Sequence, residues 1–444
     1  MNTRKDIAMS IEASRRVINA VRETDKPIIG LHSYHSDPDT IVSTRLDQEI
    51  SVMRGLPRDR YLIAYAGPLG HPGTEATLEL CGGATRIDSP GSVREQLFTD
   101  AFISTSDAPS PQSIVAYNPI THQYESLLGK PTPTWPDITD RIIIEKDHHS
   151  HRQLFNPRNN LGYALLCDHM GSATAIATLQ LKELINSGHS FEPDNPVGLM
   201  AAIKYAIWVD TQGFNGKQMS ADDIEAVQWL DHHYFTQGHL ARVRTGAFLD
   251  LCKKPLPNDW TTILDEVTSS EAYESARSVF IADLGVVHNR MIIPYIADHA
   301  FNAGEVKQAV VIFGLYAERD SDIQSNALLF SGRSKGFNGE LKKIFRHNIN
   351  LIVQENGKNV ETCCGGGRDT GLDGGITMCG NAIPLYCDPN ETTDDLVDAC
   401  MREEYAYIPR IVEGFRDIAH IDPCRGAFYS RLQGTSIRFE QTFK

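Results

Sequence analysis

Short apolar runs alternate with segments of helical periodicity along the first half of the chain. The runs are rich in β-branched and aromatic side chains, which predicts buried strands, and the segments between them repeat apolar residues at helical spacing. Strands that alternate with helices are typical of an α/β fold. The predicted strands are 27–33, 61–67, 101–105 and 141–147, the predicted helices are 4–24, 41–53 and 172–186, and a further apolar block spans 197–209.

Acidic residues and histidines gather where these apolar elements end. An α/β sheet binds ligands outside the carboxyl ends of its strands, so we interpret each of these positions as a strand-end site. Carboxylates mixed with imidazole suit Mn²⁺ or another divalent cation better than Ca²⁺. A pair of such ions would activate water for attack on phosphorus. The residues are Asp37 and Asp39 after the first strand, Asp107 after the third, Asp147, His148 and His149 at the fourth, and Asp210 after the apolar block.

Two acidic segments have simpler interpretations. The loop Asp37-Pro38-Asp39 also has the composition of a turn that caps the following helix. A second Asp-His-His sequence, at 231–233, lies inside the helical pattern of 224–235 and has no strand before it. We therefore expect a structural role for this second copy.

The second half of the chain begins after a polar stretch at about 260–275, which predicts a domain boundary or linker. The last predicted strand ends in a cluster of Ser331 and Arg333, and glycines crowd 363–376, where backbone amides can form an anion nest. A mobile glycine loop is the alternative there. The predicted strands are 279–283, 309–315 and 327–334, the predicted helices are 292–302 and 393–404, and 109–137 is expected to be a long surface excursion.

Length and composition narrow the class of protein. A chain of 444 residues with 41% apolar and 22% charged residues is typical of a globular protein with two or three domains. Its net charge of −15 disfavours non-specific binding to long nucleic acids, because such binding depends on Lys and Arg side chains that contact the phosphates. Nine cysteines without a Cys-x-x-Cys pair indicate reduced thiols. No segment has the pattern of a membrane span or a signal peptide, so we expect a cytoplasmic protein.

The order of these motifs resembles the DHH phosphoesterases that carry a DHH-associated C-terminal domain. The branch it resembles includes nanoRNases, cyclic- and linear-dinucleotide phosphodiesterases, and the single-strand exonuclease RecJ. The resemblance implies a parallel-sheet domain at 1–260, a smaller α/β domain at 276–385, a C-terminal extension at 386–444, and a homodimer. The motifs are His35-x-Asp-x-Asp39-x-x-x-Ser43, Asp107, Asp147-His-His149, Asp210-Thr-x-Gly, Ser331-x-Arg-Ser334 and Gly-Gly-Gly-Arg368.

The resemblance also implies a role for each of these residues. Asp37 would bind a first Mn²⁺, with His35 or His32 as its partner. Asp39, His148 and Asp210 would bind a second, and Asp107 would bridge the two ions. His148, His149 and Asp107 would form the catalytic group, with His149 at the scissile phosphate or orienting a ligand. The residues implied in binding the phosphate or base of the substrate are Ser331, Arg333, Gly365, Gly366, Gly367 and Arg368.

We therefore expect an enzyme that uses two Mn²⁺ ions, or Mg²⁺ or Co²⁺, to cleave short oligonucleotides or dinucleotides such as pApA and pGpG to 5′-mononucleotides. Membranes and long duplexes are not expected partners. One alternative is a RecJ-like single-strand exonuclease, and another is a small-phosphate hydrolase, such as a pyrophosphatase or phosphoadenosine phosphatase. A further alternative is a nucleotide sensor without activity, in which Ser33 and Ser104 mark a degraded metal site.

Overall fold

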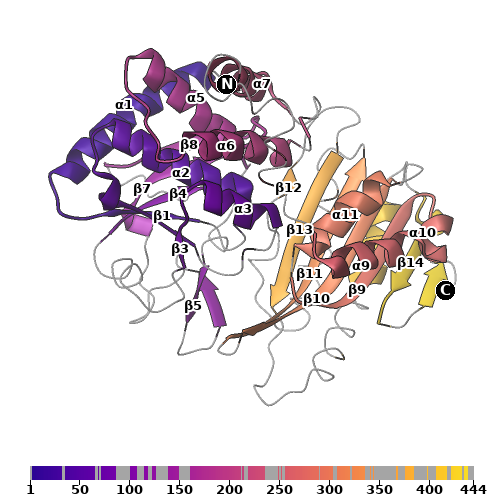
Figure 1. Cartoon of the computed structure of the whole chain (residues 1–444). Helices are drawn as coiled ribbons and strands as arrows, with labels where there is room; N and C mark the ends of the chain where they lie inside the picture. The colour runs from indigo at the N-terminus through magenta and orange to yellow at the C-terminus, as the bar shows by residue number, and fades with distance from the viewer. Residues whose placement is uncertain are drawn as a thin grey trace. The chain divides into compact units, whose positions relative to one another are not determined.

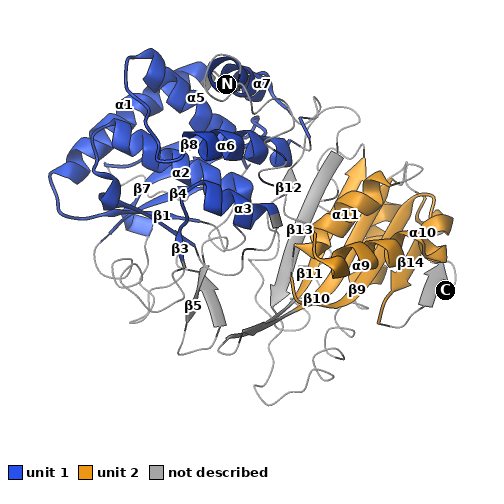
Figure 2. Cartoon of the chain, viewed as in Figure 1, with its two compact units in different colours: residues 1–255 blue, residues 256–444 orange. Residues whose placement is uncertain are grey.

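The structure is a computed structural model of the 444-residue chain, and it describes most of residues 3–341 and parts of 344–438. The longest stretches outside the described residues are 87–100, 127–138, 150–160, 236–248, 345–366 and 385–397. The chain divides into two compact units, Met1–Pro255 (unit 1) and Leu256–Lys444 (unit 2), which Figure 2 colours separately. In the part of the chain that is described, no helix is both long and apolar enough to cross a membrane.

Unit 1 is built on a six-stranded sheet in which every neighbouring pair is parallel, so the α/β prediction is confirmed. The order β3-β2-β1-β4-β7-β8 means that the chain winds outward from β1 in one direction and from β4 in the other (Figure 1). Ligands of such sheets bind at the carboxyl ends of the strands where the direction reverses. The strands are β1 (Ile28–Leu31), β2 (Tyr61–Tyr65), β3 (Thr85–Arg86), β4 (Phe102–Ser106), β7 (Ile142–Asp147) and β8 (Tyr163–Leu166).

Helix α2 (Pro38–Met53) is the most enclosed helix around the site. It contacts three strands of the sheet and three helices, and almost all of its residues are buried, including polar ones such as Asp39, Ser43 and Asp47. These polar side chains must therefore find partners inside the protein. The other helices of unit 1 are α1 (Thr3–Arg22), α3 (Pro72–Leu80), α5 (Ala173–Asn186), α6 (Pro196–Asp210) and α7 (Ala221–Leu230), with short 3₁₀ turns at Arg58–Arg60 and Thr139–Arg141.

Two features of unit 1 differ from the expectation. Asp210 is the last residue of helix α6 and does not follow a strand. The apolar block before it is buried throughout most of its length, and a helix that is apolar on every side shows no period by which to recognise it. The segment 109–137, predicted as a long surface excursion, contains a hairpin of β5 (Val115–Asn118) and β6 (Gln123–Ser126) that was not predicted.

Unit 2 is a second, smaller α/β unit, as predicted, with a seven-stranded mixed sheet of order β12-β13-β11-β10-β9-β14-β15. Strand β9 pairs in parallel with β10 and β14, and the remaining pairs are antiparallel. Helix α11 (Ile292–Asn302) contacts β10 and β11 and buries Ile293 and Ile296. The strands are β9 (Val279–Val287), β10 (Ala309–Asp320), β11 (Ile323–Lys335), β12 (Gly367–Arg368), β13 (Ile376–Pro384), β14 (Ala427–Ser430) and β15 (Thr435–Arg438).

The boundary between the two units lies at residues 255–256, close to the predicted position, but the segment 260–275 itself is not a linker. It contains most of helix α9 (Asn258–Thr268) and all of α10 (Glu271–Ser275), because Trp260, Ile263 and Val267 form one apolar stripe that packs into the core of unit 2. Strand β14 pairs with β9, so this part of the 386–444 region belongs to the second sheet rather than to a separate extension. The helix predicted at 393–404 lies, apart from Asp398, outside the described residues.

Candidate metal centre

The loop after β1 and the start of α2 contribute two of the candidate ligands. Asp37 is the N-cap of α2, and its Oδ1 accepts a hydrogen bond from the Thr40 backbone N–H (2.8 Å). The capping interpretation of this loop is therefore confirmed. Asp39 lies in the first turn of α2 and is fully buried.

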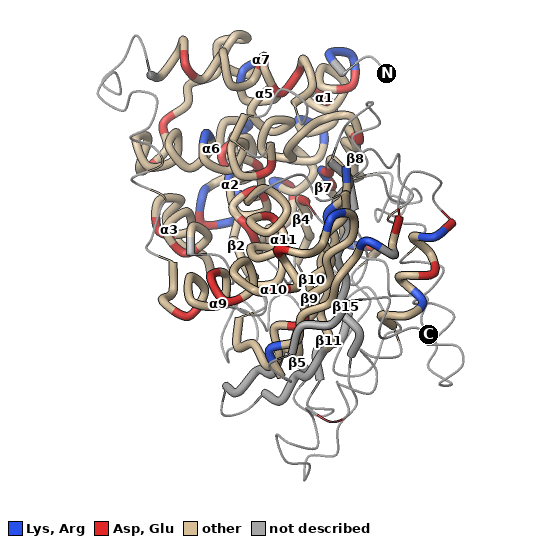
Figure 3. The backbone as a smooth tube through the Cα atoms, turned by 90° about the vertical axis from the view of Figure 1, so that its right-hand side faces the viewer, with Lys and Arg blue, Asp and Glu red and all other residues tan. Residues whose placement is uncertain are grey.

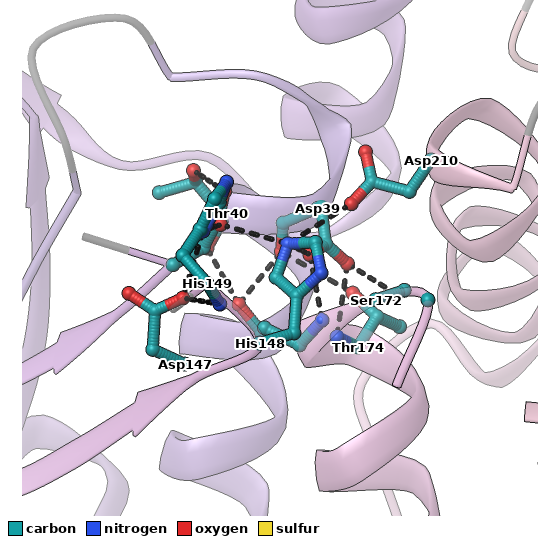
Figure 4. Close-up of polar contacts among 12 residues, drawn as sticks. Asp39, Thr40, Asp147, His148, His149, Ser172, Thr174 and Asp210 are labelled. Atoms are coloured by element: carbon teal, nitrogen blue, oxygen red, sulfur yellow. Dashed lines mark hydrogen bonds and ion pairs between the residues drawn. The ribbon is translucent and has the colours of Figure 1, made fainter. Parts of the chain in front are cut away.

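Three carboxylates converge on one nitrogen of His148 (Figure 4). Its Nε2 lies 3.2 Å from Asp107 Oδ1, 3.3 Å from Asp210 Oδ2 and 3.6 Å from Asp39 Oδ2. None of these contacts has hydrogen-bond geometry, and neither ring nitrogen of this buried imidazole has a hydrogen-bond partner among the described residues. A single N–H cannot satisfy three carboxylates, whereas a divalent cation can bind nitrogen and oxygen ligands together.

The ligand atoms form two overlapping groups whose members all lie within 4.8 Å of one another. One group is Asp39, His148 and Asp210, the set that the family resemblance implies for the second metal. The other group is Asp107, Asp147, His148 and His149. The structure thus brings together five of the residues to which a role was assigned, and also Asp147, a strand-end residue to which no role was assigned.

Asp147 orients His149. Its Oδ1 lies 2.8 Å from His149 Nδ1 and also accepts the His149 backbone N–H (2.7 Å). His149 Nδ1 is in addition 3.3 Å from Asp107 Oδ1. Burial lowers the pKa of His149, but its attraction to Asp147 and Asp107 outweighs burial and raises the pKa to about 10.

The carboxylates carry more negative charge than the two imidazoles can balance. Burial raises the pKa of Asp37 well above its usual range, and repulsion from Asp107 and Asp39 adds to this shift. Burial acts in the same direction on Asp107, but His148 and His149 outweigh it and hold the pKa of Asp107 well below its usual range. Buried carboxylates that repel one another are stabilised by bound cations, so this set of donors fits divalent metal ions.

The two histidines predicted as partners of Asp37 are His35 and His32. His35 and Ser33 lie outside the described residues. His32 follows β1 and is buried, and its two ring nitrogens have no hydrogen-bond partner in the described part of the chain. Burial lowers its pKa to about 3, so His32 is neutral at pH 7. It belongs to neither of the two ligand groups found among the described residues.

The N-terminus of helix α5 holds Asp39 in place. Asp39 Oδ1 accepts hydrogen bonds from Ser172 Oγ (2.5 Å) and the Thr174 N–H (2.9 Å), and Oδ2 accepts one from the Ala173 N–H (2.8 Å). The helix dipole adds to this stabilisation of the carboxylate. The sequence predicts a helix that starts at Ser172, but nothing in it indicates the contact with a residue 133 positions earlier.

Replacing Ser172 by alanine is expected to lower the free energy of unfolding by about 2 kcal/mol. The change removes the N-cap of α5, worth about 1 kcal/mol, and one hydrogen bond to the charged Asp39. Urea unfolding followed by circular dichroism measures the loss. Ser187→Ala, at the other end of the same helix, is the control and should stay within about 0.5 kcal/mol of wild type. Equal losses in both variants would contradict the special role of Ser172.

The predicted substrate-binding arginine in unit 2 is already paired. Arg333 donates from Nε (2.5 Å) and Nη2 (3.0 Å) to the two carboxylate oxygens of Asp298 in α11. Its Nη1 donates to Ser331 Oγ (2.8 Å) and the Gly332 carbonyl (3.0 Å). The fork that we expected to bind phosphate thus binds a carboxylate. Asp298 lies within a predicted helix, and no sequence pattern links it to Arg333.

The glycine motif is only partly described. Gly365 and Gly366 lie outside the described residues, so their predicted contacts remain predictions. Gly367 and Arg368 form the short strand β12, which pairs with β13, and nothing is described of their side chains.

The second Asp-His-His sequence has the structural role that was predicted. Asp231, His232 and His233 lie in a π-helical turn (Asp231–Phe235) that continues α7. Asp231 pairs with Lys204 (2.5 Å), and the His233 ring stacks on Trp229 with centroids 5.3 Å apart. Ser104 also has a structural partner, because its hydroxyl donates to Asp47 Oδ2 (3.2 Å).

Comparisons with known proteins leave the family of this chain open. No protein-family model and no curated protein matches it. Its matches among solved structures include a Methanococcus jannaschii protein described as a family II inorganic pyrophosphatase, with 14% identity and a TM-score of 0.33, covering 85% of this chain and 99% of that one. A likeness at this level identifies neither a fold nor an activity, so both are inferred from the residues of this chain.

Proposed function

We propose that this chain is a hydrolase of phosphate esters or anhydrides that depends on two divalent metal ions. The observation that carries the proposal is the convergence of Asp39, Asp107 and Asp210 on His148 Nε2 at the carboxyl edge of a parallel sheet. Two buried carboxylates and one partly buried one around a buried imidazole are costly for a protein to maintain unless cations bind there. The motif order that resembles the DHH phosphoesterases points to the same chemistry.

In this proposal the residues of the site have three roles: they bind the metal ions, contact the phosphate, or hold the metal ligands in place. Asp39, His148 and Asp210 hold one cation, while Asp37 and Asp107 contribute to the other. When bound, the two ions would supply an activated water and stabilise charge on a phosphoryl oxygen. His149, which Asp147 orients, would contact the scissile phosphate. The buried α2 and α5 keep Asp39 in place and exclude water from behind the site.

A short nucleotide is the substrate that we favour. Long single strands bind through basic grooves lined with aromatic side chains, and this chain has a net charge of −15. The described helices either mix Lys and Arg with Asp and Glu, as α1 and α2 do, or carry acidic residues without Lys or Arg, as α3, α7 and α9 do (Figure 3). Dinucleotides such as pApA and pGpG need few phosphate contacts, and the same metal site would also serve pyrophosphate or phosphoadenosine phosphate.

The proposal is tested by hydrolysis of a 5′-labelled RNA ladder of two to about twenty nucleotides, with pyrophosphate and phosphoadenosine phosphate assayed in parallel. We expect Mn²⁺-dependent loss of the dinucleotides, inhibition by chelator, and little cleavage of longer strands. Faster cleavage of the longest strands would indicate a RecJ-like exonuclease. Hydrolysis of only the small phosphates would indicate that class of enzyme. No hydrolysis of any of these substrates with Mn²⁺ would contradict the proposal.

The role of Arg333 in substrate binding can be separated from its ion pair with Asp298. If phosphate replaces Asp298 on the guanidinium fork, Arg333→Lys should raise KM for the favoured substrate about tenfold or more, because it removes a bidentate, charge-assisted contact. Asp298→Asn should lower KM by removing the competing charge. Steady-state kinetics of both variants test this role. If neither variant changes KM, the pair is structural.

A further inference from the structure

We infer that Thr40 is a positioning residue that holds the Asp107 carboxylate in the orientation needed to bind metal. This inference rests on the proposed function. Thr40 Oγ1 donates a hydrogen bond to Asp107 Oδ2 (2.8 Å), and both side chains are buried. The Thr40 backbone N–H donates to Asp37 Oδ1 (2.8 Å). One residue therefore contacts two candidate ligands, Asp37 and Asp107, that follow two different strands.

The main chain and the carboxylate of Asp107 are held by different contacts. Its φ of +54° lies in the left-handed region, which costs a non-glycine residue about 1–2 kcal/mol. The N–H of Asp107 donates to the Lys146 carbonyl (2.9 Å), and this bond fixes the main chain next to β7. The hydroxyl of Thr40 then fixes Oδ2, so that Oδ1 is the oxygen that faces His148 (3.2 Å) and His149 (3.3 Å).

Helix capping alone does not explain the hydroxyl of Thr40. Asp37 caps α2, and its carboxylate also accepts a hydrogen bond from the Thr40 side chain. Ser43, one turn later, bonds back to the Asp39 carbonyl of its own helix (2.6 Å), whereas the Thr40 hydroxyl crosses to a residue 67 positions away. Thr44 is a matched reference on the same helix. It is fully buried, and its hydroxyl has no hydrogen-bond partner among the described residues.

The test is the affinity for Mn²⁺, measured by titration calorimetry on the metal-stripped full chain, with the thermal midpoint recorded for each variant. Thr40→Val keeps the shape of the side chain and removes the hydroxyl, and it should weaken Mn²⁺ binding about 10- to 100-fold, as loss of a partner of a metal ligand typically does. Thr40→Ser restores the donor and should bind within about threefold of wild type. Thr44→Val is the control and should bind as wild type does. If Thr40→Val does not fold, Thr40→Ala replaces it in the test, and we expect the same loss of Mn²⁺ affinity.

The outcomes separate the two claims. If wild type binds Mn²⁺ and both Thr40→Val and Thr40→Ala bind it equally tightly, the role of Thr40 is overturned. The proposed function then still stands. A loss of affinity in Thr44→Val as large as in Thr40→Val also overturns the role of Thr40, because the effect would then come from disturbing α2. A wild-type chain that binds no Mn²⁺ overturns both the role of Thr40 and the proposed function.

Discussion

Replacing His148 by alanine is expected to lower the turnover number by about three orders of magnitude. The imidazole lies within 3.6 Å of three carboxylates, so its loss removes the only nitrogen ligand that the two groups share. Stabilisation of charge by a bound metal is worth several kcal/mol, and each 1.4 kcal/mol changes a rate about tenfold. The measurement is Mn²⁺-dependent hydrolysis of whichever substrate the wild type cleaves fastest.

The second Asp-His-His sequence supplies the matched control for this variant. His232→Ala removes an exposed imidazole from the π-helical turn after α7 and should leave turnover near that of wild type. Both variants change the same type of residue in the same local sequence. If His232→Ala were inactive while His148→Ala kept its activity, the site would be misplaced in the chain.

Removing the carboxylate of Asp47 is expected to destabilise the chain by about 3–5 kcal/mol. Asp47 on α2 forms an ion pair with Lys146 on β7, and both side chains are almost completely buried. Burial raises the pKa of Asp47 and lowers the pKa of Lys146, which means that burial opposes the charged form of each partner. Asp47→Ala would therefore leave a buried ammonium without its counterion, which is the costly way to break such a pair. Urea unfolding measures the loss.

An apolar replacement of the whole pair should behave differently. In the double variant Asp47→Leu, Lys146→Met no charge stays buried, so its stability should lie much closer to wild type than that of Asp47→Ala. If the double variant loses as much free energy of unfolding as Asp47→Ala does, the ion pair itself stabilises the fold. Its effect would then not be limited to leaving no charge unpaired. Because Lys146 precedes Asp147, activity should be recorded for both variants.

Strands β1, β2, β4 and β7 of unit 1 could be predicted from the sequence because their signal is local, whereas the short strands β3 and β8 at the two edges of the sheet were not predicted. Ile142, Ile143 and Ile144 form a compact β-branched run, and the acid and histidines follow directly. Asp37, Asp39 and Asp107 also lie shortly after predicted strands in the sequence, so their positions could be predicted in the same way. The carboxyl ends of parallel strands then meet at one edge, so the candidate ligands could be named before the structure was known.

The partners of those ligands could not be predicted, because each is a contact between distant parts of the chain. Thr40 and Asp107 are 67 residues apart, Ser172 and Asp39 are 133 apart, and no local pattern links either pair. The ion pair of Arg333 with Asp298 is of the same kind. Asp210 was assigned to the wrong type of element for another reason, since α6 is too evenly apolar to show whether it is a helix or a strand.

Equilibrium dialysis of the metal-stripped chain against Mn²⁺ tests the metal centre without depending on the choice of substrate. The proposed centre predicts two bound ions per wild-type chain, and it predicts that His148→Ala loses at least one of them. Wild-type protein that binds no Mn²⁺, or a His148→Ala variant that binds as many ions as wild type with the same affinity, would contradict a two-metal phosphohydrolase at this site.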